Sequence, residues 1–252
     1  MAPITAVALE GIPPISEGDD LAALLAEAML PGAPAAGDVL VLAHKVVSKS
    51  EGRTRRLSSV TPTARARELG ARLGKDARHV QVVLDESREV RRAEHGVLIA
   101  VTHHGFVCAN AGVDSSNAPD DDTVILLPQD PDRSAQELRS RLRDLLDGPA
   151  PAVVITDSFG RAWRHGQCDI AIGCAGLLPL DDWRGHHDSR GHRLSATVIA
   201  AADELAAAAD LARAKDSMQP AVLVSGAGRH VSPDPGPGAT ALIRSEAQDL
   251  FR

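Results

Sequence analysis

The feature that most constrains this chain is the stretch at residues 153–173, which begins as an apolar run and then turns abruptly polar. The run 153–156 predicts a buried strand. An acid, a hydroxyl, a glycine and two arginines follow within a few positions: Asp157, Ser158, Gly160, Arg161 and Arg164. A carboxylate at a strand end beside a cationic loop suits a metal ion and phosphate groups. The alternative is a surface loop whose charges are merely solvated.

The composition limits the size and the partners of the protein. The chain has 252 residues, 44% of them hydrophobic, which is enough for one large domain or two modest ones. Aromatic residues make up only 2% and tyrosine is absent, so the core must be built from Ala, Leu, Val and Ile. The formal net charge of −7 argues against a nucleic-acid partner, yet it permits a local basic pocket for a small anion.

The sequence indicates a cytoplasmic protein. Its first residues lack the basic start and apolar run of a signal peptide, and no apolar run is long enough to span a membrane. The three cysteines, Cys108, Cys168 and Cys174, are an odd number with no zinc spacing. We therefore expect free thiols that behave as small buried hydrophobic side chains in a reducing compartment.

Local patterns predict an alternation of strands and helices. A strand at 7–15 runs into a rigid loop with two prolines, and further strands are expected at 38–42, 97–101, 106–109, 124–127 and 221–225. Helices are expected at 21–30, 63–73, 78–89, 132–146 and 194–215, with a short amphipathic helix in the tail at 239–252. Residues 44–49 are predicted as the polar end of a strand, and 181–193 as a mobile surface loop.

Two other segments carry groups that suit phosphate chemistry. Lys45 and Lys49 offer point charges for a polyphosphate, although they also fit a solvated strand end. In the loop at 110–117, Asp114 offers oxygen ligands for a hard cation and Asn117 an amide donor, although an Asx turn has the same composition. The glycines at 70–74 do not form a Walker A motif, and no G-x-G-x-x-G element follows a strand.

Taken together, these acids and cations could surround one cleft. Such a set favours a metal-dependent enzyme that acts on phosphates. No Ser-His-Asp or Cys-His nucleophile is evident, and G-x-S-x-G is absent.

Several ordered motifs make the chain resemble a known family. They include Gly-Ile-Pro-Pro-Ile at 11–15, His-Lys-Val-Val-Ser-Lys-Ser-Glu-Gly at 44–52, Asn-Ala-Gly-Val-Asp-Ser-Ser-Asn at 110–117 and Thr-Asp-Ser-Phe-Gly-Arg-Ala-Trp-Arg at 156–164. With these and shorter segments in register, the chain resembles the coenzyme F420-0:L-glutamate ligases. The resemblance assigns residues 1–225 to the ligase domain, leaving 226–252 as a Pro/Gly-rich segment with a C-terminal helical tail.

The resemblance implies a fold and a reaction. The fold is α+β, with mixed and antiparallel sheets, flanking helices and an intertwined homodimer. The substrates are the small molecules F420-0, L-glutamate and GTP, with no nucleic acid and no membrane. GTP converts the terminal carboxylate of F420-0 to an acyl phosphate, and the amine of L-glutamate attacks it to give an amide, GDP and phosphate. Related members add further γ-linked glutamates.

The resemblance also implies site residues, carried over by position. The divalent cations, Mg²⁺ or Mn²⁺ with K⁺ as a further candidate, would be bound by Asp114, Asp157 and Ser158. GTP would be contacted by Ile12, Pro13, Pro14, Ile15, His44, Lys49 and Asn117. To these we add Arg161 and Arg164, as clamps for the phosphodiester of the acceptor or for the acyl phosphate.

Two departures keep other functions open. His44 stands where relatives often carry Ser or Gln, and residues 211–216 differ from the Met-Gly-Lys segment that contributes to the nucleotide site in relatives. The nucleotide preference and the acceptor therefore stay open. The alternatives are a ligase for a different carboxylate acceptor, a catalytically silent binding subunit and a metal-dependent phosphohydrolase.

Overall fold

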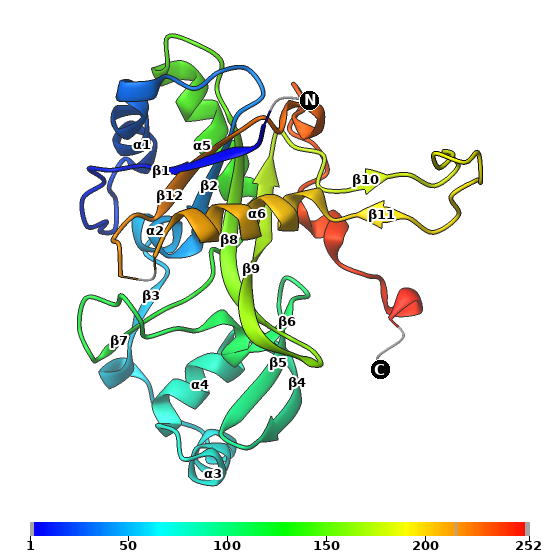
Figure 1. Cartoon of the computed structure of the whole chain (residues 1–252). Coiled ribbons are helices and arrows are strands. Elements are labelled where there is room, and N and C mark those ends of the chain that lie inside the picture. Colours follow the sequence, from blue (N-terminus) through cyan, green and yellow to red (C-terminus); the bar gives the residue numbers. More distant parts are fainter. Residues whose placement is uncertain (1–2, 215, 250–252) are drawn as a thin grey trace.

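A five-stranded mixed sheet lies at the centre of the protein (Figure 1), in a computed structural model that describes residues 3–214 and 216–249. The strand order is β1-β12-β2-β8-β9. Only β2 and β8 pair in parallel, while the other neighbours are antiparallel. The strands are β1 (Thr5–Ala8), β2 (Val39–Ala43), β8 (Ala152–Arg161), β9 (Arg164–Ala175) and β12 (Ala221–Ser225). Strand β2 and the first half of β8 are aliphatic apart from Thr156, as expected for strands that are buried on both faces.

Helices cover both faces of this sheet. On one face α1 (Leu21–Met29) and α5 (Pro131–Leu145) bury Leu25 and Leu142 against Ile155 of β8. On the other face the alanine-rich helix α6 (Ala201–Ala212) packs its small side chains against the sheet. Both clusters are mainly aliphatic, and Phe106 and Phe159 are the phenylalanines among their buried residues. The prediction of an aliphatic core is therefore confirmed.

A second lobe is built from the chain between β2 and β8. Its three-stranded antiparallel sheet contains β4 (Ser87–Glu94), β5 (Val97–Thr102) and β6 (Val107–Ala109), covered by α3 (Ala64–Leu73) and α4 (Ala77–Asp85). The pair β3 (Thr54–Arg56) and β7 (Thr123–Ile125) connects it to the rest of the chain. The long β8–β9 hairpin runs from the central sheet towards this lobe (Figure 1).

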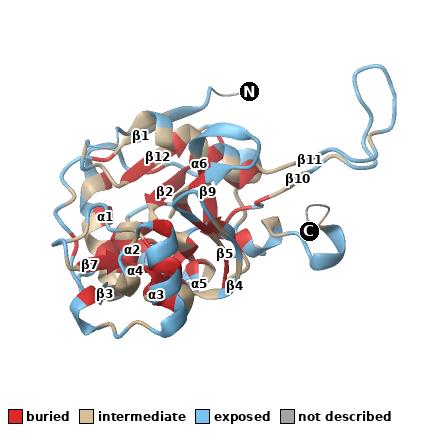
Figure 2. Cartoon of the chain, turned by 90° about the horizontal axis from the view of Figure 1, so that it is seen from below, coloured by how far each residue is buried: buried red, intermediate tan, exposed pale blue. Residues whose placement is uncertain are grey.

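The remaining elements are short. Helix α2 (His44–Ser50) follows β2 directly, and the pair β10 (Asp181–Asp182) and β11 (Val198–Ile199) forms the base of an arm that extends away from the body (Figures 1 and 2). The 3₁₀ helices are η1 (Leu30–Gly32), η2 (Leu57–Ser59), η3 (Asn110–Gly112), η4 (Gly228–His230), η5 (Ala239–Leu242) and η6 (Glu246–Gln248).

The α+β class, with mixed and antiparallel sheets and flanking helices, is confirmed. Across residues 3–214 and 216–249, no helix combines the length and the apolar character that a membrane span needs. The three cysteines are free, and burial raises the pKa of both Cys108 and Cys174 to about 12. These two thiols therefore stay protonated, as expected for small buried hydrophobic groups. The expectation is wrong for Cys168, which is only partly buried.

Five local predictions were wrong. Residues 44–50 form helix α2 rather than a strand end, and α4 ends at Asp85, where β4 follows. Helix α6 begins at Ala201, after the β-branched residues 197–199, which favour an extended backbone. Strand β1 is Thr5–Ala8, so the strand expected at 7–15 ends at Ala8. The surface position expected for 181–193 is confirmed, because apart from the short β10 these residues form the largely exposed turns of the arm. The tail has the 3₁₀ turns η5 and η6 instead of an amphipathic α-helix, and residues 250–252 lie outside the described part.

Candidate functional site

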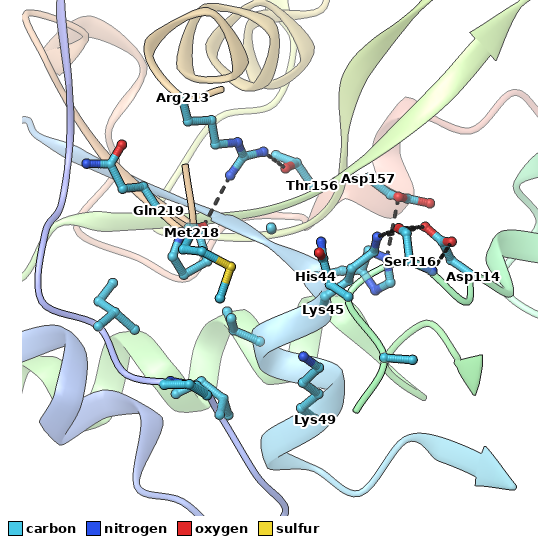
Figure 3. A pocket seen from close by; sticks show the side chains of 18 of the residues that line it. His44, Lys45, Lys49, Asp114, Ser116, Thr156, Asp157, Arg213, Met218 and Gln219 are labelled. Atoms are coloured by element: carbon cyan, nitrogen blue, oxygen red, sulfur yellow. Dashed lines mark hydrogen bonds and ion pairs between the residues drawn. The ribbon is translucent and has the colours of Figure 1, made fainter. Parts of the chain in front are cut away.

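A cavity of about 890 Å³ lies where β2 ends, a size typical of small-molecule sites. Its walls come from segments far apart in the sequence: 12–17, 43–49, 54, 114–119, 156–158, 167–169, 210–214 and 218–220. Figure 3 shows Lys45 and Lys49 on α2, with Asp114 and Asp157 at one end and Arg213 and Gln219 at the other.

The ends of two neighbouring strands explain this position. The pairing of β2 with β8 stops at Ala43 opposite Thr156, because the chain then turns into α2. Strand β8 continues to Arg161, so Asp157 and Ser158 lie beyond the end of β2. The expected strand is longer than the apolar run, since Asp157 and Ser158 continue β8 into the β8–β9 hairpin. Both residues still line the cavity.

Asp114 lies at the same end of the cavity as Asp157 and is held by backbone and side-chain contacts. Its backbone exchanges two hydrogen bonds with Ile125 of β7. Its carboxylate lies 2.7 Å from Lys45 Nζ and accepts hydrogen bonds from the amide and hydroxyl of Ser116, each 2.8 Å long. Burial raises the pKa of Asp114, but the bonds from Lys45 and Ser116 outweigh it, and the pKa lies below its ordinary value. Asp114 is therefore anionic at neutral pH.

His44 lies beside Asp157 at the start of α2. Its imidazole is almost fully buried, and Nδ1 lies 3.1 Å from the hydroxyl of Ser48. Nε2 lies 3.4 Å from Asp157 Oδ1 and has no hydrogen-bond partner within the described residues. A buried ring nitrogen without a partner is costly, so it indicates a position where a ligand supplies the missing contact.

Lys49 lines the cavity one helical turn beyond Lys45. Burial, and then the neighbouring charge of Lys45, lower the pKa of Lys49. Two cations held close together in a partly buried site favour a polyanionic ligand.

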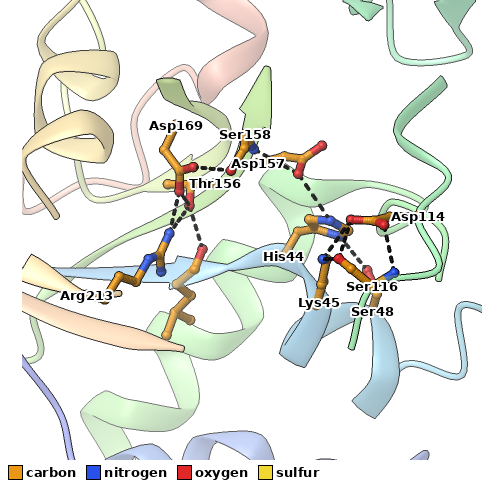
Figure 4. A network of polar contacts seen from close by, with 11 residues as sticks. His44, Lys45, Ser48, Asp114, Ser116, Thr156, Asp157, Ser158, Asp169 and Arg213 are labelled. Carbon is orange, nitrogen blue, oxygen red and sulfur yellow. Dashed lines mark hydrogen bonds and ion pairs between the residues drawn. The ribbon is translucent and has the colours of Figure 1, made fainter. Parts of the chain in front are cut away.

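A largely buried network in the cavity wall includes Ser158 (Figure 4). The hydroxyl of Ser158 donates a 2.6 Å hydrogen bond to Oδ1 of Asp169, its partner across the β8–β9 hairpin. Oδ2 of Asp169 accepts a 2.8 Å bond from Thr156 and an ion pair from the guanidinium of Arg213. Arg213 also donates to Thr156 and to the backbone oxygen of Pro220. The network connects the cavity wall at Ser158 with the C-terminal end of α6.

The donor set at this end of the cavity fits a hard divalent cation. Asp114 and Asp157 offer carboxylate oxygens and Ser158 a hydroxyl oxygen. Within residues 3–214 and 216–249, no three His, Cys, Asp or Glu side chains lie close enough to bind a metal by themselves. Two carboxylates and a hydroxyl fit Mg²⁺ or Mn²⁺, which commonly bind one or two carboxylates and complete their shell with substrate phosphates and water.

The structure brings ten of the predicted site residues to this one cavity: Ile12, Pro13, Pro14, Ile15, His44, Lys49, Asp114, Asn117, Asp157 and Ser158. Arg161 and Arg164 are not among the lining residues described. They lie beside the exposed tip of the β8–β9 hairpin, where Arg161 donates to the backbone oxygens of His165 and Gly166.

Sequence reasoning missed the roles of Asp169 and Arg213. The signal for Asp169 was a single acid in the otherwise apolar run 168–175, since a buried charge needs a partner. Arg213 gave no local signal, because it lies 44 residues from Asp169 in the sequence and meets it only through the packing of α6.

Comparisons with known proteins agree on one family. A family model described as F420-0:Gamma-glutamyl ligase matches residues 11–226. Among curated relatives, the coenzyme F420:L-glutamate ligase of Methanopyrus kandleri is 43% identical over 240 residues, covering 94% of this chain and 93% of its own length. The enzymes of the same name from Methanothermobacter thermautotrophicus and Archaeoglobus fulgidus are 40% and 44% identical, over 73% and 71% of this chain and 73% and 70% of their own lengths.

Proposed function

Since the chain belongs to the F420-0:gamma-glutamyl ligase family, we propose that it is a GTP-dependent ligase that joins L-glutamate to coenzyme F420-0. The observation that supports this most strongly is the meeting of ten expected ligand-binding residues on one cavity. These residues come from four separate segments of the chain, so sequence proximity does not explain their convergence.

The proposed nucleotide site lies between the proline loop and α2. The residues at 12–15 form an apolar wall with a rigid backbone, because two of the four are prolines. In this proposal Lys49 donates to polyphosphate oxygens, the buried Nε2 of His44 beside Asp157 is a further donor, and Asn117 adds an amide. Each of these contacts is proposed for GTP.

The proposed cation site is formed by Asp114, Asp157 and Ser158. When bound, Mg²⁺ or Mn²⁺ neutralises charge on the phosphoryl group that is transferred. Lys45 holds the carboxylate of Asp114 in place, and His44 lies against that of Asp157. The chain thereby keeps two anionic oxygens oriented towards the place where the terminal phosphate of GTP would lie. K⁺ is a further candidate ion.

The proposed reaction has two steps. A carboxylate oxygen of F420-0 attacks the γ-phosphorus of GTP, the bond to the β–γ bridging oxygen breaks, and an acyl phosphate and GDP result. The amine of L-glutamate then attacks the acyl carbon, and phosphate leaves with the C–O bond electrons as the amine loses a proton. The cavity binds the reactants side by side, which removes much of the entropic cost of a reaction between separate molecules. No protein nucleophile is required.

Arg161 and Arg164 are proposed to bind the phosphodiester of the acceptor or the acyl phosphate. Both are exposed near the tip of the β8–β9 hairpin, outside the cavity of this chain. Guanidinium groups bind phosphate oxygens in a bidentate manner. In this role the hairpin tip would hold the distal part of an acceptor whose reacting carboxylate reaches the cavity.

A mass-spectrometric assay tests this function. The protein is incubated with F420-0, L-glutamate, GTP and Mn²⁺, and a mass gain of one or more glutamyl units is expected. Release of phosphate from GTP without any acceptor would instead identify a phosphohydrolase, and turnover only with other carboxylates would identify a different ligase. GTP binding without turnover under every condition would identify a binding subunit.

A homodimer is proposed as the working form. The arm between β10 and β11 extends from the body with no other part of the described chain against it (Figure 2). Large apolar side chains near its base, Leu178 and Val198, are exposed. An arm of this kind is typical of segments that wrap around a second subunit. Light scattering coupled to size-exclusion chromatography is expected to give twice the mass of the chain, and a monomeric mass would exclude this proposal.

A further inference from the structure

Asp169 is a buried carboxylate whose two oxygens have different partners. Its side chain is 2% exposed. Oδ2 faces the guanidinium of Arg213 and the hydroxyl of Thr156, which together satisfy it. Oδ1 accepts the 2.6 Å hydrogen bond from Ser158. The ion pair with Arg213 thereby holds the carboxylate in one orientation, with Oδ1 directed at Ser158 (Figure 4).

This bond determines how the hydroxyl of Ser158 can act towards a cation. A hydroxyl has one hydrogen and two lone pairs. Because Asp169 carries no hydrogen to donate as a carboxylate, Ser158 must donate its hydrogen to Asp169. The hydrogen therefore points towards Asp169, and what the oxygen can offer to a cation at Asp157 and Ser158 is a lone pair. An uncharged oxygen that binds a divalent cation must present a lone pair, and a hydrogen pointing at the ion would repel it.

We propose that Asp169 is a positioning residue that fixes the Ser158 hydroxyl in the orientation needed to bind a divalent cation, and that Arg213 holds Asp169 in place for this task. The inference rests on the cation site of the proposed function. Asp169 itself does not touch the cation in this account. Groups that hydrogen-bond to metal ligands commonly change metal affinity by about 10–100-fold when they are removed.

Two double variants of equal net charge isolate this role. D169N/R213M and D169L/R213M both remove the buried ion pair, and pairs replaced by uncharged side chains of similar volume are often tolerated. The asparagine can still turn its oxygen to Ser158 and its amide to Thr156, whereas the leucine offers no acceptor. The two proteins therefore differ in the acceptor for the Ser158 hydrogen and not in charge. Thermal unfolding followed by circular dichroism verifies that both fold.

Mn²⁺ is the probe, titrated into each protein in the presence of saturating GDP, with free Mn²⁺ read from its electron paramagnetic resonance signal. We expect Kd for Mn²⁺ to be about tenfold weaker in D169L/R213M than in D169N/R213M. When S158A is added to both, the two are expected to bind Mn²⁺ equally. Equal affinities with Ser158 present, or a tenfold gap that persists in the S158A proteins, would overturn the proposal.

A single variant separates this inference from the proposed function. D157N removes a carboxylate of the proposed cation site and is expected to weaken Mn²⁺ binding strongly. If D157N binds Mn²⁺ as tightly as the unaltered protein, the proposed cation site is wrong. If D157N weakens Mn²⁺ binding while the two double variants bind Mn²⁺ equally, the proposed cation site is supported and only the role of Asp169 is wrong.

Discussion

Replacing Arg213 with methionine is expected to destabilise the folded protein by about 3–5 kcal/mol, the usual cost of leaving one member of a buried ion pair alone. The side chains of Arg213 and Asp169 are 9% and 2% exposed, so the pair is shielded from most of the solvent. Methionine fills much of the same volume, which makes lost packing a minor contribution. The hydroxyls of Thr156 and Ser158 still donate to Asp169, and this support keeps the cost from being larger.

Thermal unfolding followed by circular dichroism measures this cost. For a chain of this size, 1 kcal/mol corresponds to about 2–4 °C, so the midpoint of R213M should fall by about 6–20 °C. R184M is the matched control, because Arg184 pairs with Asp182 on the surface with both side chains largely exposed, and its midpoint should change by no more than about 2 °C. D169L/R213M should recover most of the loss. A midpoint for R213M equal to that of R184M would refute the reasoning.

Three further predictions concern the cation site, the nucleotide site and the sheet. D157N should abolish turnover with little change in the unfolding midpoint, because it removes a metal-binding charge and no core packing; a large fall in the midpoint would favour a structural role. Since the pKa of Lys49 lies below 10.5, Lys49 loses its proton at a lower pH than an ordinary lysine does. GDP affinity, measured by calorimetry, should therefore fall as the pH rises towards that value, and K49M should lack this fall. G173A should lower the free energy of unfolding by at least about 1–3 kcal/mol, because the added Cβ would lie 2.3 Å from the backbone oxygen of Pro131. G160A is the control, because a Cβ at Gly160 would meet open space. If urea unfolding shows the same loss of stability in both variants, the argument is contradicted.

Local sequence patterns predicted the central strands well, because those patterns depend on burial alone. The apolar runs of β8 and β12 were identified from sequence, as were the helices α1 and α5. Helix α2 was missed because Val46 and Val47 continue the apolar run of β2, so nothing marks the change from strand to helix. Strand β4 was missed because its many charged residues read as a helix surface, and only its pairing with β5 makes it a strand.

The site residues that stand in recognisable sequence motifs could be predicted. Those that reach the site only through packing could not. Asp114, Asp157 and Lys49 stand in motifs of ordered residues, and the cavity brings them together. The partnership of Ser158 with Asp169 depends on the register of the β8–β9 hairpin, which includes an irregularity after Ile155 that the sequence does not reveal. The placement of Arg161 and Arg164 outside the cavity follows from the length of that hairpin, which carries both residues past the end of β2.

The most direct test of the account is a crystal of the protein grown with GDP and Mn²⁺, with data collected at a wavelength where manganese scatters anomalously. The account predicts an anomalous peak within about 2.5 Å of carboxylate oxygens of both Asp114 and Asp157, with the phosphates of GDP beside Lys49. A peak bound elsewhere, or GDP phosphates on a different surface, would contradict the claim that these distant segments form one site for cation and nucleotide.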